Sequence, residues 1–198
     1  MNLQALFDGL LAAVALWLAW GPGRSMPAVR LGAVLLGVAA VLGTLRFSGL
    51  LVLPALHQSM SMLGAGVGLP LLGVAVVWPS GEVTRQRRYA WIFGVSAAVL
   101  CVLIAVMAGV KMWPSACALL AVVAMFVVGL KRQQWLVVAA AVFLLAALLA
   151  FATKLELAPL RPGDLLHIGL TIGLALFGQW VTTVSMRSGR DVTGRTVG

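Results

Sequence analysis

Apolar residues dominate the chain in seven long runs, and short segments between them carry most of the charged residues. Each run is close to the ~20 residues that an α-helix needs to cross the hydrocarbon core of a bilayer. The predicted helices span residues 3–20, 29–47, 55–78, 89–109, 112–130, 135–152 and 164–184. We therefore expect an all-α membrane protein in which residues 1–184 form one seven-transmembrane-helix bundle and residues 185–198 form a frayed tail.

The end of the second predicted helix has two interpretations. Residues 31–45, between Arg30 and Arg46, are uncharged and make a short span by themselves. Either the Arg46 side chain extends from the helix end to the interface, or the helix continues toward Leu53. In both cases Pro54 separates this helix from the third.

Composition narrows the class of protein further. The chain is 62% hydrophobic and only 10% charged, with a mean hydropathy of +1.08. Soluble domains are about 45–50% apolar and roughly a quarter charged. A soluble enzyme, a disordered chain and a coiled coil are therefore excluded. The net charge of +9 would suggest nucleic acid in a soluble protein, but here the basic residues fall between apolar runs. We expect a lipid bilayer, and no nucleic acid, as the partner.

The distribution of basic residues predicts an orientation in the bilayer. Of the 14 Lys and Arg residues, seven spans place four on one side, namely Arg46, Lys111, Lys154 and Arg161, and the other ten opposite. Because cytoplasmic loops carry the excess of Lys and Arg, the N-terminus is expected outside and the C-terminus, with the tail 185–198, in the cytoplasm. The Ala-, Gly-, Leu- and Arg-rich composition is typical of a bacterium with GC-rich codons, which predicts the bacterial inner membrane.

Two GxxxG patterns predict where helices pack closely. Gly64 and Gly68 form one in the third helix, and Gly169 and Gly173 form the other in the seventh. Small residues let helix backbones approach each other in lipid. The patterns favour packing within the bundle, and a dimer face is the alternative.

A sparse set of polar residues falls near the outer ends of the predicted helices. The ionisable members are Asp8, Arg46, His57, Asp164 and His167, and Ser59 and Ser61 follow His57 on the third helix. Ionisable groups at membrane depth are costly, which makes them candidates for a functional site. Because the two histidines lie at similar heights, we expect both imidazoles to face one shared pocket in the interior of the bundle.

Each member of the set also has a structural interpretation. Asp164 follows Pro162 and is placed to cap the last helix, and Asp8 is placed to neutralise Arg46 in a buried pair. As neutral imidazoles, His57 and His167 would each donate one hydrogen bond to a neighbouring helix. The sharper hypothesis is a metal site. Asp164 and His167 are three residues apart and share a helix face, and a carboxylate beside an imidazole fixes its tautomer and raises its basicity. His57, His167 and Asp164 are then the candidate ligands, with Asp8 as an alternative carboxylate.

The layout resembles the CREST superfamily, which includes the alkaline ceramidases, the progestin and adipoQ receptors and the Per1-type proteins. There, a Ser and a His on helix two, an Asp on helix three and an HxxxH on helix seven hold zinc for amide hydrolysis in lipids. His167 matches the helix-seven histidine, but Gly163 and Thr171 stand where an HxxxH partner would be, and His57 replaces the helix-three Asp. The run from Gly163 to His167 is also similar to the last helix of some uncharacterised bacterial seven-helix proteins.

Three classes of function remain open, and no catalytic residue is assigned. The first, which we favour, is a non-enzymatic sensor, assembly factor or accessory subunit that works with other membrane subunits. The second is a metal-dependent intramembrane hydrolase of a lipid-like substrate, with zinc on His57, His167 and a carboxylate and one position open for water. The third is a haem- or quinone-binding electron carrier with the two histidines as axial ligands.

Overall fold

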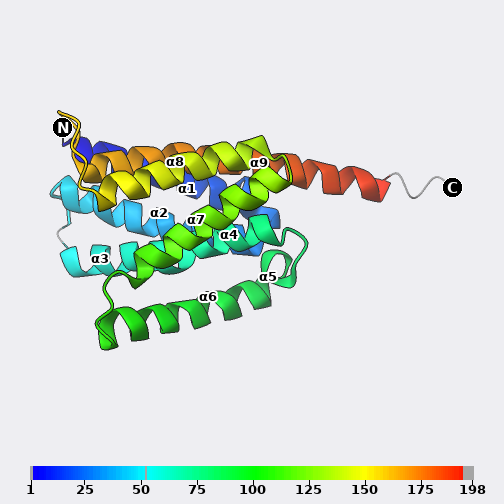
Figure 1. The fold of residues 1–198 in the computed structure, drawn as a ribbon, viewed down its shortest axis with the longest axis horizontal. Coiled ribbons are helices and arrows are strands. Elements are labelled where there is room, and N and C mark those ends of the chain that lie inside the picture. The colour runs from blue at the N-terminus through cyan, green and yellow to red at the C-terminus, as the bar shows by residue number, and fades with distance from the viewer. Residues whose placement is uncertain (1, 52, 194–198) are drawn as a thin grey trace.

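A computed structural model describes residues 2–51 and 53–193, with side chains up to residue 186, and its apolar runs are helical (Figure 1). The α-helices are α1 (Leu3–Trp20), α2 (Pro27–Phe47), α3 (Pro54–Leu63), α4 (Leu69–Val77), α5 (Glu82–Arg85), α6 (Arg87–Val102), α7 (Trp113–Lys131), α8 (Trp135–Ala152) and α9 (Pro162–Thr193). A 3-10 helix, η1 (Pro22–Ser25), follows α1, and π-helical segments η2 (Gly64–Gly68) and η3 (Leu103–Met107) follow α3 and α6.

Seven helical segments in the described part of the chain are long and apolar enough to cross a membrane. Three are composite spans, because η1 continues α1, η2 joins α3 to α4, and η3 continues α6. Their bounds agree with the predicted ranges to within a few residues, which confirms the all-α seven-helix bundle. Together they indicate a multi-pass membrane protein.

The structure decides two helix ends, one as predicted and one not. Helix α2 ends at Phe47, which places Arg46 in its last turn and decides against continuation toward Leu53. There the positive guanidinium also complements the negative C-terminal end of the helix dipole. The expectation of a frayed tail from residue 185 is wrong as far as Thr193, because α9 continues to that residue. No proline interrupts its backbone ladder. Residues 194–198 lie outside the described part.

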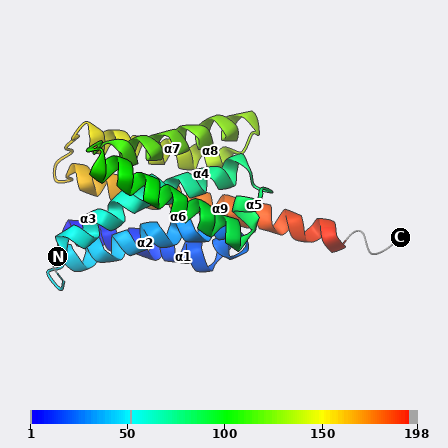
Figure 2. The ribbon, with the colours of Figure 1, turned by 90° about the horizontal axis from the view of Figure 1, so that it is seen from below.

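Six of the spans pack around a central core that α9 closes against α1, and α6 lies outside this ring. Helix α1 packs on α2 and α9, α8 packs on α7 and α9, and α7 also packs on α4. Figure 2 shows the α1–α2 pair and the α7–α8 pair on opposite sides of the molecule. Helix α6 stands at the edge, where it contacts α2, α5 and η2. The largest fully buried side chains include Leu18, Met125 and Phe177.

Both GxxxG patterns pack inside the bundle, as the sequence favoured. A Cβ on Gly169 would lie 2.6 Å from Cβ of Ala147, and one on Gly173 would lie 2.7 Å from Leu144, both in α8. A Cβ on Gly68 would lie 3.1 Å from a backbone oxygen of α2. The small residues therefore set the spacing of α9 from α8 and of η2 from α2.

The third span is interrupted at mid-length by η2, although its sequence predicts one continuous helix. Pro70 lacks an N–H, and in a regular helix its ring would clash with the carbonyl of Gly66. The backbone instead widens by one residue, so that the N–H of Leu69 donates to the oxygen of Gly64. Such π-helical turns occur frequently at functional sites.

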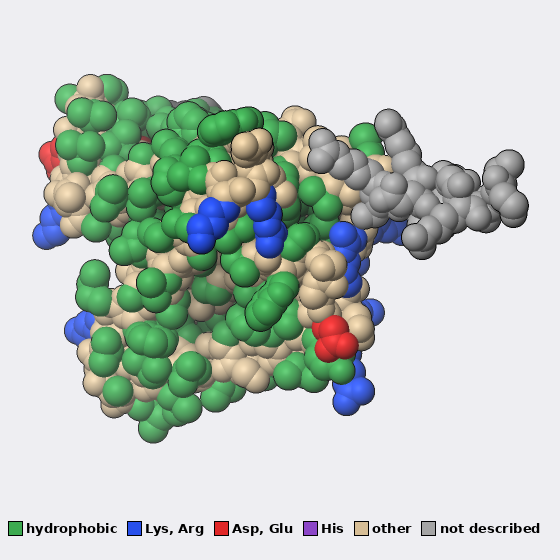
Figure 3. Space-filling model, turned by 45° about the vertical axis from the view of Figure 1, so that its right-hand side comes forward, with side chains coloured by type: hydrophobic (Ala, Val, Ile, Leu, Met, Phe, Trp, Pro, Cys, Tyr) green, Lys and Arg blue, Asp and Glu red, His purple; other side chains and the backbone are tan. Residues whose placement is uncertain are grey.

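The long sides of the helix bundle are mainly apolar, and one end of the bundle is strongly basic. Figure 3 shows hydrophobic side chains over most of the side in view, with Lys and Arg gathered mainly toward the end from which α9 projects. We call this the basic end; it is formed by η1, α5, the start of α6 and the end of α7. The opposite end contains the starts of α1, α3 and α9 and therefore most of the predicted polar set.

Candidate functional site

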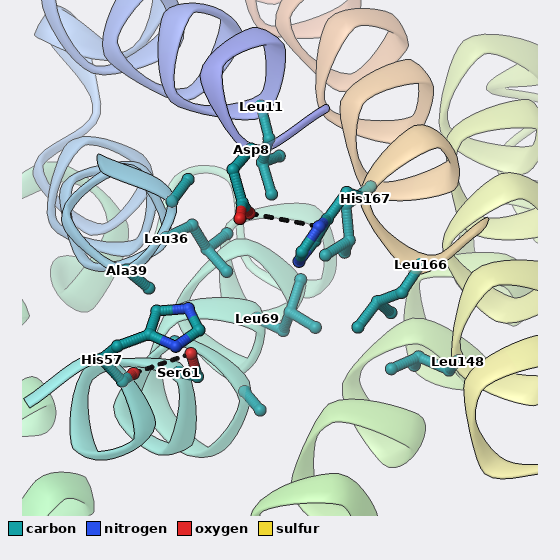
Figure 4. A pocket seen from close by; sticks show the side chains of 14 residues that line it. Asp8, Leu11, Leu36, Ala39, His57, Ser61, Leu69, Leu148, Leu166 and His167 are labelled. Carbon is teal, nitrogen blue, oxygen red and sulfur yellow. Dashed lines mark hydrogen bonds and ion pairs between the residues drawn. The ribbon is translucent and has the colours of Figure 1, made fainter. Parts of the chain in front are cut away.

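A cavity of about 110 Å³ lies near the end of the bundle opposite the basic end. It is lined by residues of α1, α2, α3 with η2, the start of α4, α8 and α9. Its polar side chains are Asp8, His57, Ser61 and His167, and its walls are mainly leucine (Figure 4). His57 and His167, for which the sequence predicted one shared pocket, both line this cavity.

Asp8 and His167 form the centre of the polar wall. Nδ1 of His167 lies 3.1 Å from Oδ1 of Asp8, and the two side chains are 17% and 1% exposed. The contact has the distance of an ion pair but not the angle of a hydrogen bond, and neither Asp8 oxygen has a hydrogen-bond donor among the described residues. The carboxylate therefore retains unused acceptor capacity next to the cavity.

Gly43 of α2 makes room for this carboxylate. A Cβ built on Gly43 would overlap the Asp8 side chain, with both oxygens inside contact distance. Any larger residue at position 43 would therefore displace Asp8 from His167. The sequence contained a signal for this contact, because a small residue opposite a buried polar one permits close approach in lipid. Sequence reasoning nevertheless did not assign Gly43 to the site.

Arg46 contacts His57 rather than Asp8. Nη1 of Arg46 lies 3.3 Å from Nδ1 of His57, and the guanidinium sits 5.3 Å from the ring centroid of Phe47. Phe47 and His57 meet edge to face, with their ring centroids 5.9 Å apart. The expected Asp8–Arg46 pair is therefore wrong. Asp8 is held one turn deeper, against Gly43, whereas Arg46 in the last turn of α2 extends toward α3.

Asp164 caps α9, as one of its two interpretations predicted. Its Oδ2 accepts a hydrogen bond of 2.8 Å from the backbone N–H of Arg161. This is the reciprocal half of a capping box, in which an acidic side chain in the first turn satisfies the N-cap amide. Asp164 is 2% exposed and does not line the cavity.

Of the two serines on α3, only Ser61 lines the cavity. Ser61 lines the cavity and donates a 2.8 Å hydrogen bond to the backbone oxygen of His57, one turn earlier. Ser59 is exposed and lies outside the cavity. Of the predicted site residues, Asp8, His57, Ser61 and His167 are thus brought together, and Arg46 joins through His57.

The donor set does not fit a zinc site with three protein ligands. Within the described ranges 2–51 and 53–193, no group of three or more His, Cys, Asp or Glu side chains is close enough together to hold a metal ion. Asp164 is used in the cap, and the Asp8 carboxylate meets His167 at Nδ1. A second-sphere partner would meet an imidazole in the same way, but a third first-sphere ligand is missing.

The arrangement suits hydrogen bonding to a small amphipathic molecule. Figure 4 shows His167 with one ring nitrogen toward Asp8 and the other directed away from it, and His57 on the opposite side of the leucine side chains. Both oxygens of the Asp8 carboxylate keep open acceptor positions beside the cavity. The cavity then presents acceptors at one wall and apolar surface at the others.

Fold and site together define a seven-helix protein with membrane-spanning dimensions and a polar pocket near one end. Residues 3–185 match the family DUF6962, a family of unknown function, and the chain belongs to that family. No curated protein and no solved structure matches the chain.

Proposed function

We propose that this protein is a non-enzymatic membrane protein, a sensor or an accessory subunit, whose cavity binds a small ligand with a hydrogen-bond-donating head group and an apolar body. The Asp8–His167 contact carries the proposal. A carboxylate that is 1% exposed, with both oxygens free of hydrogen-bond donors in the described structure, borders a cavity whose other walls are mainly leucine.

The energetics of burial support a ligand with a donor group. An unsatisfied polar group away from water costs about 1–3 kcal/mol, and more if it is charged. A hydroxyl or amine bound beside Asp8 would supply the missing donor, whereas a carboxylate would add like charge. The apolar walls favour an alkyl body, because a ligand pocket fixes orientation through a few polar groups on a hydrophobic lining.

The orientation proposed for the chain places this cavity in the outer leaflet. Ten of the 14 basic residues fall on the side of the basic end, so by the positive-inside rule that end and the C-terminus face the cytoplasm. We infer from composition that the membrane is the inner membrane of a bacterium. A ligand would then enter from the outer leaflet or the outer surface.

The side chains around the cavity also bear on the two other classes of function. A zinc hydrolase of the CREST type needs a third ligand, which the described side chains do not assemble. The presence of two imidazoles on one cavity keeps a haem- or quinone-binding carrier as the second candidate. Absorption spectra of the purified protein test the haem version, because bound haem gives a Soret band and the proposed ligand does not.

The histidines themselves provide the test, because the chain has only two. The full chain, labelled with ¹⁵N-histidine in neutral detergent micelles, gives imidazole NMR signals from His57 and His167 alone. We expect hexanol and hexylamine to shift the His167 signals in a saturable way. Hexane, which has the same alkyl body and no donor, should leave them unchanged.

Two variants on one helix serve as a matched pair. Ser61→Ala changes the cavity wall and should weaken hexanol binding, whereas Ser59→Ala, outside the cavity lining, should not. Asp8→Asn removes the carboxylate that would accept from the ligand head group, and should weaken the binding of both hexanol and hexylamine. The proposal would be overturned if hexane shifted the His167 signals as much as hexanol does. It would also be overturned if neither hexanol nor hexylamine shifted them.

A further inference from the structure

A second cavity, of about 440 Å³, lies at the basic end between η1, α2 and α6. Three arginines from these three elements line it: Arg24 from η1, Arg30 from the first turn of α2, and Arg87, the first residue of α6. No acidic side chain is among its lining residues. Segments far apart in sequence thus bring three positive charges around one hollow.

These charges have no counter-charge in the part of the protein with described side chains. None of the three guanidinium groups lies within ion-pairing distance of a described carboxylate. Helices α2 and α6 both begin at this cavity, and neither has an acidic residue in its first turn or a side-chain cap. Helix N-termini favour anions, so Arg30 and Arg87 are unfavourably placed unless an anion sits between them.

The rest of the cavity is lined by apolar side chains, which an acyl chain could contact. Leu31 and Val34 of α2 and Ala90 of α6 line it below the arginines. Farther along, α6 closes onto α2, since a Cβ on Gly94 would lie 2.8 Å from the Leu31 side chain. The cavity is therefore charged at its mouth and hydrophobic toward the middle of the span.

Two tryptophans flank the arginines at the depth of an interface. Trp20 and Trp91 line the cavity and are 57% and 50% exposed. The Arg30 guanidinium lies 5.8 Å from the Trp20 ring centroid, a cation–π contact that holds it at the mouth. Tryptophan is enriched where membrane meets water, at the level of lipid head groups.

We propose that this cavity binds an anionic glycerophospholipid, with its phosphate among Arg24, Arg30 and Arg87 and its acyl chains along α2 and α6. Arginine clusters bind phosphate by bidentate, charge-assisted hydrogen bonds. A free phosphate would use the arginines but leave the apolar wall unused. A zwitterionic lipid would bring a choline cation close to three guanidinium groups. The site is separate from the Asp8–His167 cavity and does not depend on what binds there.

Native mass spectrometry of the full chain, released from neutral detergent, measures the affinity directly. The probes are dioleoylphosphatidylglycerol, dioleoylphosphatidylcholine and inorganic phosphate. We expect one phosphatidylglycerol to bind per chain well before further copies add, and at least tenfold more tightly than phosphatidylcholine. Inorganic phosphate should not displace it at millimolar concentration, because it lacks the acyl contacts.

Neighbouring arginines supply the matched control. Arg87→Gln should weaken phosphatidylglycerol binding about fivefold, and the triple variant with Arg24→Gln and Arg30→Gln about a hundredfold. Arg88→Gln removes the same charge one residue away, outside the cavity lining, and should change the affinity less than twofold. All of these side chains are exposed, so folding is expected to survive, and melting temperatures without lipid check this.

Three outcomes would overturn the proposal. If Arg87→Gln and Arg88→Gln weaken phosphatidylglycerol binding equally, the binding depends on the general surface charge and not on this cavity. Equal affinity for phosphatidylcholine would remove the role of net charge. Displacement by millimolar inorganic phosphate would assign the cavity to a soluble anion instead.

Discussion

The contact between Asp8 and His167 can be tested by a double-mutant cycle in which each variant keeps the approximate shape of the side chain. Asp8→Asn preserves the volume that packs against Gly43, and His167→Phe preserves a ring without hydrogen-bonding capacity. The paired atoms lie 3.1 Å apart, and both side chains are largely buried. Either single change therefore leaves a buried polar group without its partner.

The expected magnitudes follow from burial and from the membrane environment. Leaving a buried polar group without its partner costs about 1–3 kcal/mol in soluble proteins, and more if the group is charged. Coupling energies of polar pairs between membrane helices are smaller, averaging about 0.6 and reaching about 1.7 kcal/mol. Because Asp8 is 1% exposed and both of its oxygens lack other donors in the described structure, we expect each single variant to lose about 2–3 kcal/mol. The coupling should fall near the upper limit, about 1.5 kcal/mol.

Unfolding of the full chain in micelles of increasing SDS fraction, followed by tryptophan fluorescence, supplies the four free energies of the cycle. A second cycle, of Asp8→Asn with Arg46→Gln, is the control. The structure places Arg46 on His57, so these two changes should be additive to within about 0.5 kcal/mol. Additivity between Asp8 and His167, or stronger coupling of Asp8 to Arg46, would refute the arrangement described here.

Three further predictions concern packing, capping and orientation. Gly43→Ala should lower the free energy of unfolding by about 1–3 kcal/mol, since the new Cβ would overlap the Asp8 carboxylate. Gly163→Ala, with nothing within 4 Å of a built Cβ, should leave it unchanged or slightly raised in the same SDS titration. Asp164→Ala removes the acceptor of the N-cap amide and should cost about 1 kcal/mol, visible as a lower melting temperature; an unchanged value would contradict the cap. A reporter active only in the cytoplasm should be active after Gly198 and silent at the N-terminus, and the reverse result would invert the proposed orientation.

The helices were predictable because each depends on a property that is local in sequence. The length of an apolar run determines whether a segment spans a bilayer, and Pro27, Pro54 and Pro162 each stand in the first turn of a helix, where a missing N–H costs nothing. The Asp164 cap was predictable for the same reason, since it joins residues three apart.

The partners of the polar side chains were not predictable in the same way. The sequence placed Asp8, Arg46, His57 and His167 at one end of the bundle, but height along a helix does not determine which neighbour a side chain faces. That choice depends on the rotation of each helix, which close contacts such as Asp8 on Gly43 set. The π-helical segment η2 was not predicted for a similar reason. Pro70 is visible in the sequence, but the widened turn packs against α2, which is remote in sequence.

Sequence alone thus determined that the chain forms seven membrane-length helices and that its basic residues are distributed asymmetrically between the two ends. It also determined that the aspartates and histidines within the predicted spans lie near the less basic end. Only the tertiary structure decided that Asp8 meets His167 and Arg46 meets His57, and that three distant arginines surround one cavity at the basic end. The physical reason is that the hydrophobicity of each apolar run by itself determines whether that run can span a bilayer. Pairing in lipid instead depends on helix rotation and on small-residue contacts between segments remote in sequence.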